Sequence, residues 1–232
     1  MFHDICFITL TNDGYLDYTL NCYKSLEKCG AMVTLTSYVI GQEAFKRLNK
    51  EGYSCVLLEN IEIDQNKLLL YRKEGWSNLM YHKINIVYKL LQKHDYVCIT
   101  DGDIVFENPD FLNYCIDKIG KRDVLFQNNK MKDNQAVICG GFAVIKSNEK
   151  TKQMYDVRNI KPEDISIEQN FLKGKIKKLD INVGFLPLNL YPNGKYYYRY
   201  RNKEPHLIHF NWIETSKKQQ RMEKLEKWYL HL

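Results

Sequence analysis

The amino-acid sequence predicts one α/β domain built on a mainly parallel β-sheet. Apolar runs of residues that favour β-strands alternate with segments of helical periodicity up to about residue 146. This alternation is typical of strands joined by helical crossovers. The chain has 232 residues, of which 44% are hydrophobic and 27% charged, and is long enough to bury one core. It contains only 12 Gly and 5 Pro and shows neither a linker nor a repeat, which excludes low-complexity structure.

The first hundred residues supply most of the regular pattern. Strands are expected over residues 4–10, 32–40, 53–58 and 96–100. Asn12 and Asp13 offer an N-cap to the first helix, and Gly30 ends it. A short helix is expected over 42–50 and a longer one over 76–93, where Met80, Ile84, Val87 and Leu91 share one face.

The second half of the chain begins regularly and then loses its pattern. Asn108-Pro109 is expected to start a helix with Pro in its first position. Strands are expected over 123–127 and 136–145, and helices over 147–157 and 163–172. Aromatic and basic residues crowd 195–201, where an edge strand that also contacts an acceptor is the expectation. At the C-terminus, Met222, Leu225, Tyr229 and Leu232 recur at helical spacing.

Composition and charge indicate the cellular compartment of the protein and the kind of partner it binds. No apolar run approaches the roughly 18 residues that span a bilayer, and residues 1–10 favour a strand over a signal peptide. The seven cysteines form no Cys-x-x-Cys pair, which favours free thiols in a reducing compartment. A soluble, cytoplasmic protein is therefore expected. The net charge is +6, and residues 195–232 hold nine Lys/Arg against four Glu, which suits an anionic partner.

The sharpest chemical feature is Asp101-Gly102-Asp103, directly after the apolar run 96–100. Ligands of open α/β sheets bind beyond the carboxyl ends of strands, and two carboxylates one residue apart suit a divalent cation such as Mg²⁺ or Mn²⁺. Gly102 allows the backbone to approach closely. The alternatives are a solvated turn and the nucleophile loop of a haloacid-dehalogenase-type phosphatase, in which Asp101 would attack phosphorus.

Four segments together resemble GT-A glycosyltransferases of the nucleotide-diphospho-sugar transferase family and its glycogenin-like relatives. They are Ile8 to Tyr15, Lys83, the Asp101-Gly102-Asp103 motif in ITDGDIVFENP, and His209-Phe210-Asn211-Trp212-Ile213 with the later Lys217. The Lys-, Asn- and Tyr-rich composition is also similar to that of small glycosyltransferases of large algal viruses, which would place the protein in host cytoplasm. The resemblance implies a single GT-A-like, Rossmann-like domain over 1–232, with helices on both faces of the sheet.

The resemblance further implies a division of labour along the chain. Residues 1–127 would form the nucleotide-binding half, ending after the strand that carries the acidic motif, and 128–232 would complete the acceptor and metal sites. Asp101, Asp103 and His209 would be the metal ligands, and their mixed Asp/His set favours Mn²⁺ over Mg²⁺.

The resemblance implies contacts to a UDP-sugar donor as well. Leu10, Thr11, Asn12 and Tyr15 would hold the nucleobase and ribose, with Asp101 and Gly102 nearby. Lys217 and Lys83 would neutralise the diphosphate, and Lys218 could substitute for Lys217. Simple capping by Asn12, packing by Tyr15 and a solvated face for Lys217 are the structural alternatives.

The donor sugar is expected next to Gly140 and Gly141, because Gly within a strand marks a bulge or the close approach of a ligand. Glu168 and Gln169, in the place of an Asp-Gln pair in the family, would lie near the anomeric carbon. The expected reaction is transfer of a hexose from a UDP-sugar to a hydroxyl of a glycan or glycoprotein, with retention of configuration. The alternatives are the phosphatase, a non-catalytic sugar-nucleotide binder and a nucleic-acid binder, although no nucleic-acid partner is expected.

Overall fold

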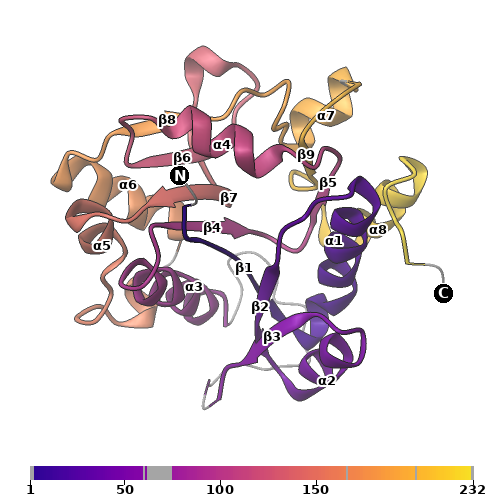
Figure 1. Ribbon diagram of the computed structural model, residues 1–232, viewed down its shortest axis with the longest axis horizontal. Helices are drawn as coiled ribbons and strands as arrows, with labels where there is room; N and C mark the ends of the chain where they lie inside the picture. The colour runs from indigo at the N-terminus through magenta and orange to yellow at the C-terminus, as the bar shows by residue number, and fades with distance from the viewer. Residues whose placement is uncertain (1–2, 60, 62–74, 166, 202, 231–232) are drawn as a thin grey trace.

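The computed structural model describes residues 3–59, 61, 75–165, 167–201 and 203–230 and has a layered α/β architecture (Figure 1). Within these residues the central sheet has seven strands in the order β3-β2-β1-β4-β7-β6-β8. The strands are β1 Ile5–Asn12, β2 Leu35–Ile40, β3 Ser54–Leu57, β4 Tyr96–Thr100, β6 Val124–Asn128, β7 Ile138–Lys146 and β8 Val183–Phe185. Only β7 runs against its two neighbours, so the expected mainly parallel sheet is confirmed.

A separate two-stranded sheet lies beyond β4. It pairs β5, Ile104–Phe106, with β9, Leu207–His209, in antiparallel register. Ile104 lies opposite His209, so this pairing carries the late histidine to the acidic motif that β4 delivers. Residues more than a hundred positions apart therefore meet at one edge of the fold.

Helices cover both faces of the central sheet, as expected (Figure 1). One face carries α1 Leu16–Cys29, α2 Gln42–Lys50 and α4 Phe111–Ile119. The other carries α3 Trp76–Leu91, α5 Glu149–Tyr155 and α6 Glu168–Leu179. Because both faces are covered, β4, β6 and β7 are buried along nearly their whole length instead of alternating between buried and exposed residues.

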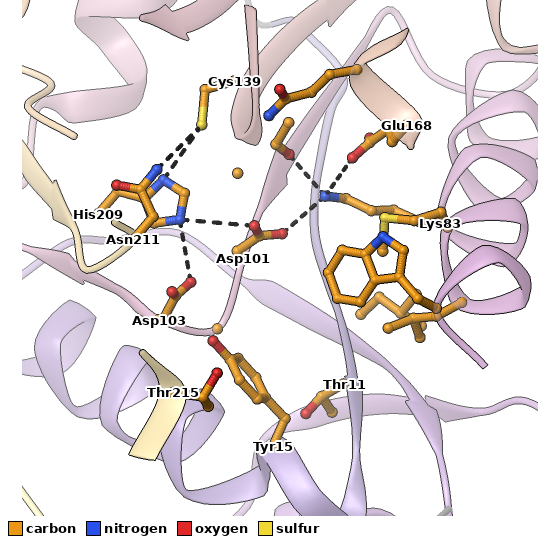
Figure 2. Close-up of a pocket in the computed structure, with 18 of the residues that line it drawn as sticks. Thr11, Tyr15, Lys83, Asp101, Asp103, Cys139, Glu168, His209, Asn211 and Thr215 are labelled. Atoms are coloured by element: carbon orange, nitrogen blue, oxygen red, sulfur yellow. Dashed lines mark hydrogen bonds and ion pairs between the residues drawn. The ribbon is translucent and has the colours of Figure 1, made fainter. Parts of the chain in front are cut away.

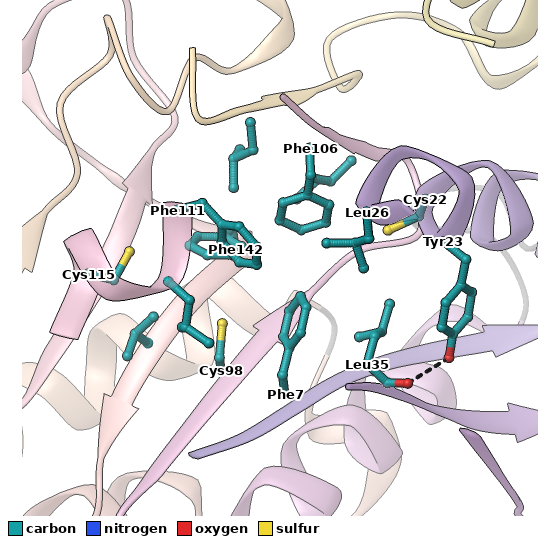
Figure 3. Close-up of a cluster of buried hydrophobic side chains, with 14 of the residues drawn as sticks. Phe7, Cys22, Tyr23, Leu26, Leu35, Cys98, Phe106, Phe111, Cys115 and Phe142 are labelled. Atoms are coloured by element: carbon teal, nitrogen blue, oxygen red, sulfur yellow. Dashed lines mark hydrogen bonds between the residues drawn. The ribbon is translucent and has the colours of Figure 1, made fainter. Parts of the chain in front are cut away.

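Alternate side chains of each central strand enter different cores. Phe7, for example, packs with Phe106, Phe111 and Leu35 on the α1 face, as Figure 3 shows, whereas Ile8 packs with α3 on the opposite face. Successive side chains of a strand point to opposite sides, which gives each strand a place in both cores. The two cores hold the carboxyl ends of β1 and β4 side by side.

A third, smaller core fixes the C-terminal part of the chain. It joins α7, Gly194–Tyr200, and α8, Thr215–Lys224, to α1 and β5 through buried residues. These residues are Tyr18, Val105, Tyr197, Ile208, Phe210 and Met222. Short 3₁₀ turns occupy Asp13–Tyr15, Asp133–Gln135 and Pro162–Asp164.

Several sequence-based expectations need correction. The segment 195–201 is largely the helix α7 and not an edge strand, because the side chain of Asn193 caps it by accepting from the Tyr196 amide at 3.0 Å. The helix expected at Asn108-Pro109 begins only at Phe111. Leu232 lies outside the described residues, and α8 ends at Lys224.

The expected cap of the first helix is also different. Asn12 precedes a 3₁₀ turn and makes no side-chain cap bond there. Asp13 instead accepts from the Ala44 amide at 2.7 Å, at the start of α2. Gly30 ends α1 with a left-handed φ of 74°, as expected. The proposed boundary between residues 127 and 128 falls inside β6, so the two halves of the chain share one sheet.

Candidate functional site

A cavity of about 480 Å³ opens at the carboxyl ends of β1 and β4 (Figure 2). This is the edge at which open α/β sheets bind their ligands. The cavity gathers nearly all of the residues singled out in the sequence. They are Leu10, Thr11, Asn12, Tyr15, Lys83, Asp101, Gly102, Asp103, Gly140, Gly141, Glu168, Gln169 and His209.

The acidic motif is anchored where β4 ends. The Asp101 amide donates to the Gly141 carbonyl of β7 at 2.7 Å, which fixes the start of the turn. At Gly102 a Cβ atom would lie 2.6 Å from Thr19 Oγ1 of α1, so only glycine fits between the two carboxylates. The close approach expected at Gly102 is therefore made by α1.

In each carboxylate of the motif, one oxygen pairs with a lysine and the other faces His209. Lys83 Nζ lies 2.9 Å from Asp101 Oδ1, and Lys218 Nζ lies 2.5 Å from Asp103 Oδ2. The other oxygens point toward His209, whose Nε2 lies 3.9 Å from Asp101 Oδ2 and 3.4 Å from Asp103 Oδ1. The ion pairs thus orient the carboxylates while leaving one oxygen of each for another ligand.

His209 reaches this position from β9 and is held from behind by β6. Its Nδ1 lies 2.8 Å from Gln127 Oε1, and both side chains are buried. Its ring also fills the space beside Gly141, where a Cβ atom would overlap the imidazole. The His209 ring makes the close approach at Gly141, where that of a donor sugar was expected, and the expected bulge is present as a register shift between β6 and β7.

These three side chains suit a divalent cation. One ligand atom from each of Asp101, Asp103 and His209 lies within 4.8 Å of the others. Two carboxylate oxygens and one imidazole nitrogen match the hard and borderline donors that Mg²⁺ and Mn²⁺ accept. The donor set therefore fits the metal that the sequence predicts.

Neighbouring charges determine which of the clustered side chains, Asp103 and His209, carries a proton. Burial by itself disfavours the ionised form of Asp103, but Lys218 and His209 hold the pKa of its carboxyl well below the usual range. Burial likewise opposes protonation of His209, yet Asp103 and Cys139 raise its pKa to about 10. Without a metal, the ring carries a proton at neutral pH that a cation must displace.

Lys83 lies on α3 and is buried between two carboxylates. Its Nζ donates to Asp101 Oδ1 at 2.9 Å, to the Gly140 carbonyl at 2.8 Å and to Glu168 Oε2 at 3.2 Å. An ammonium group has three N–H donors, so all of them are engaged. Burial raises the pKa of Glu168, and Lys83 only partly offsets that effect. Lys83 thus organises Asp101 and Glu168, and it would have to release one of them to bind a diphosphate.

The two adjacent lysines of α8 have different surroundings. The Lys217 side chain is 65% exposed, lies outside the cavity and pairs with Glu214 at 2.6 Å. The Lys218 side chain is only 8% exposed and donates to Asp103 and, at 2.9 Å, to the Tyr15 hydroxyl. The structure therefore brings Lys218 to the cavity and leaves Lys217 on the surface.

Sequence reasoning gave no role to Gln127 and Asn211, and it offered Lys218 only as a substitute for Lys217. Gln127 lies within β6 and outside the cavity lining, and its neighbours in the sequence carry no signal of its role. Asn211 orders the loop after His209, since its Oδ1 accepts from the Gly194 amide at 2.7 Å. For Lys218 a signal exists, because it precedes Met222 by four residues and so shares that residue's buried helix face.

Comparisons with known proteins agree with this arrangement. A model of the nucleotide-diphospho-sugar transferase family matches residues 35–222. The galactosyltransferase LgtC, solved with donor and acceptor sugar analogs, is 16% identical with a TM-score of 0.63, over 97% of this chain and 94% of that one. A glycosyltransferase involved in glycosylation of the major capsid of PBCV-1 is 12% identical with a TM-score of 0.60, over 95% and 99% of the chains.

A third structure shows the same fold inside a larger protein. The bifunctional glycosyltransferase WbbM is 13% identical with a TM-score of 0.60, over 92% of this chain. The present chain spans about half of that protein, 47% of its length. A comparison with curated protein sequences gives no match. At these identities the structural likenesses establish the fold, which is that of GT-A glycosyltransferases.

Proposed function

The chain belongs to the nucleotide-diphospho-sugar transferase family, and from this premise we propose that it transfers a hexose from a UDP-sugar to an acceptor hydroxyl. The convergence of Asp101, Asp103 and His209 in a cavity at the end of β4 carries the proposal. A glycan or glycoprotein is the proposed acceptor class. In the described part of the chain, no helix has the length and apolar character required to cross a membrane.

The donor nucleotide is proposed to lie along the end of β1. Leu10, Thr11, Asn12 and Tyr15 line this part of the cavity. Thr11 is held by a 2.8 Å hydrogen bond from Thr19, so it is placed before any ligand arrives. Its position supports contacts of this segment with the base and ribose.

The diphosphate is proposed to lie beside the acid–histidine cluster, within reach of Lys218. Two N–H groups of Lys218 are directed to Asp103 and Tyr15, which fixes the ammonium beside the cluster. Asp101, Asp103 and His209 would hold Mn²⁺, favoured over Mg²⁺ by the imidazole ligand. When bound, such a cation neutralises the charge that develops on the leaving diphosphate.

The transferred sugar is proposed to lie beside Gly141, near Glu168 and Gln169 of α6. Lys83 holds the Glu168 carboxylate in place, and burial favours its neutral form. Glu168 would form a hydrogen bond with a sugar hydroxyl, as donor when neutral or as acceptor when ionised. The ionised carboxylate would also stabilise positive charge that develops at the anomeric carbon. Retention of configuration is proposed from the resemblance to retaining enzymes.

In the phosphatase alternative, Asp101 would be a nucleophile and not a metal ligand. There Asp101 would need a free oxygen for attack on phosphorus, and it would form a phosphoenzyme. In the structure Lys83 binds Oδ1 of Asp101, while Oδ2 lies 3.9 Å from His209 Nε2 and is left for another ligand, so these contacts suit either role. The family match favours the transferase.

The test is a calorimetric titration of UDP into the protein with Mn²⁺, repeated with EDTA and with GDP as the base control. We expect a dissociation constant of about micromolar order for UDP that requires the metal. Absence of UDP binding under both conditions would contradict the proposal. Release of UDP from UDP-sugars then separates an enzyme from a non-catalytic binder.

A further inference from the structure

An exposed tryptophan stands at the cavity, three residues after the candidate metal ligand His209. Trp212 is 55% exposed, whereas Phe210 beside it is fully buried. Large hydrophobic side chains are exposed at five positions in the described residues, namely Met32, Val56, Phe185, Tyr200 and Trp212. Of these, Trp212 is the one that lines the cavity. Its exposure is therefore located where a ligand would meet it.

The backbone of Trp212 is unusual for a bulky residue. Its φ is +59°, in the left-handed region that side chains rarely adopt. The other non-glycine residues with positive φ in the described chain terminate or directly follow helices, where this conformation is common. They are Asp180, Arg201 and Glu226. Trp212 lies instead in the loop between β9 and α8, so helix termination does not explain it. Strain of this kind is characteristic of ligand sites.

Neighbouring contacts hold the indole in place. Trp212 Nε1 donates to Asn129 Oδ1 at 2.8 Å, which satisfies its polar group. Lys195 Nζ lies 5.2 Å from the ring centroid and so approaches one face of the indole. The preceding residue is clamped as well, because Asn211 accepts hydrogen bonds from Gly194 and from the Tyr198 hydroxyl. An exposed aromatic ring fixed in this way loses little conformational entropy when a ligand stacks on it.

From this geometry we infer that Trp212 is the stacking platform of the acceptor site and that the acceptor presents a pyranose ring to it. The C–H face of a pyranose carries partial positive charge and pairs with the negative face of an indole, as a cation does. Lys195 at the same ring adds a donor for a sugar hydroxyl. The inference rests on the proposed function, since it assigns the second substrate of that reaction.

The anchoring of Trp212 separates it from the nucleotide. Its partner Asn129 follows β6, whereas the nucleotide is proposed to lie along β1 and Tyr15. In Figure 2 Thr11 and Tyr15 lie on one side of the acid–histidine cluster, and Cys139 of β7 lies on the other. The Asn129 amide pairs with Val137 at the start of β7, so Trp212 is tied to this second side. A sugar stacked there approaches the cluster from the side opposite the base.

The experiment compares wild type with Trp212→Ala, Trp212→Phe and the matched control Phe185→Ala, an exposed aromatic of β8 outside the cavity. UDP affinity with Mn²⁺ is measured by calorimetry. UDP release from UDP-sugars is measured with and without a panel of methyl pyranosides as acceptors. We expect Trp212→Ala to raise the acceptor KM about tenfold or more, and Trp212→Phe and Phe185→Ala to change it by less than about threefold.

The outcomes separate this inference from the proposed function. The inference is wrong if no methyl pyranoside stimulates UDP release by the wild-type protein, or if Trp212→Ala leaves the acceptor KM unchanged. It is also wrong if Trp212→Ala mainly weakens UDP binding, because the indole then serves the nucleotide. Loss of metal-dependent UDP binding in the wild type itself would instead contradict the proposed function, on which the inference depends.

Discussion

The side-chain oxygen of Gln127 accepts the Nδ1 proton of His209 across 2.8 Å, although the two residues are 82 positions apart. The orientation of the amide is fixed, because Gln127 Nε2 donates to the carbonyls of Tyr191 at 3.2 Å and Pro192 at 3.0 Å. Its Oε1 must therefore be the atom that faces the imidazole. The proton stays on Nδ1, and the lone pair that deprotonation creates is on Nε2, toward Asp101 and Asp103.

Loss of this hydrogen bond should weaken metal binding. Gln127→Met removes the acceptor and should lower Mn²⁺ affinity about 10–100-fold, as for other residues that orient a metal-binding histidine. Gln127→Glu keeps an acceptor but places a carboxylate against two carbonyls, so it should retain metal affinity and lower the melting temperature. Mn²⁺ titration without nucleotide, together with thermal unfolding, measures both. Equal Mn²⁺ affinity in Gln127→Met and wild type would refute the positioning role.

Metal affinity should rise with pH. The pKa of His209 is about 10 in the metal-free protein, so below that value binding of a cation to Nε2 releases one proton. The association constant for Mn²⁺ should therefore increase about tenfold per pH unit from pH 6 to 8. Titrations in non-chelating buffers check the slope. His209→Gln should bind more weakly with a flatter profile, and a flat profile in the wild type would mean that His209 is not a displaced ligand.

Replacement of either of two adjacent lysines by the neutral side chain Met should affect UDP affinity to very different extents. Lys218→Met removes a buried cation beside Asp103, and the dissociation constant for UDP with Mn²⁺ should rise about tenfold or more. Lys217→Met is the matched control, since its exposed ion pair with Glu214 contributes little, and UDP affinity should stay within about twofold. The reverse order would show that α8 presents Lys217 to the diphosphate.

Substitution of two glycines by alanine should have different effects on metal affinity and stability. Gly141→Ala places a methyl group where the His209 ring lies, so the ring must move and Mn²⁺ affinity should fall about tenfold or more. Gly174→Ala in α6 meets no atom within 4 Å and should increase the free energy of unfolding by about 0.5–1 kcal/mol. Urea unfolding and Mn²⁺ titration test the pair. Unchanged metal affinity in Gly141→Ala would place His209 elsewhere in the metal-bound state.

Elements with strong local signals were predictable from the sequence. The apolar run 96–100 is β4 and the segment 42–50 is α2, both with the expected bounds. Gly30 ends α1 because only glycine enters the left-handed region without strain. In the segment 195–201 the aromatic content favoured a strand, whereas the cap at Asn193 and the burial of Tyr197 on β5 and β9 favour the helix that forms.

The sequence by itself determined the α/β class and the acidic motif at the end of a buried strand, because these depend on periodicity and on chemistry carried by neighbouring residues. The association of that motif with a late histidine came from the resemblance to a known family. Only the tertiary structure decided which side chains meet. Lys217 and Lys218 are about 100° apart on a helix, so the docking of Met222 in the third core sends one to solvent and the other to Asp103. Gln127 meets His209 only because β6 lies behind β9, and such long-range contacts depend on how whole elements pack.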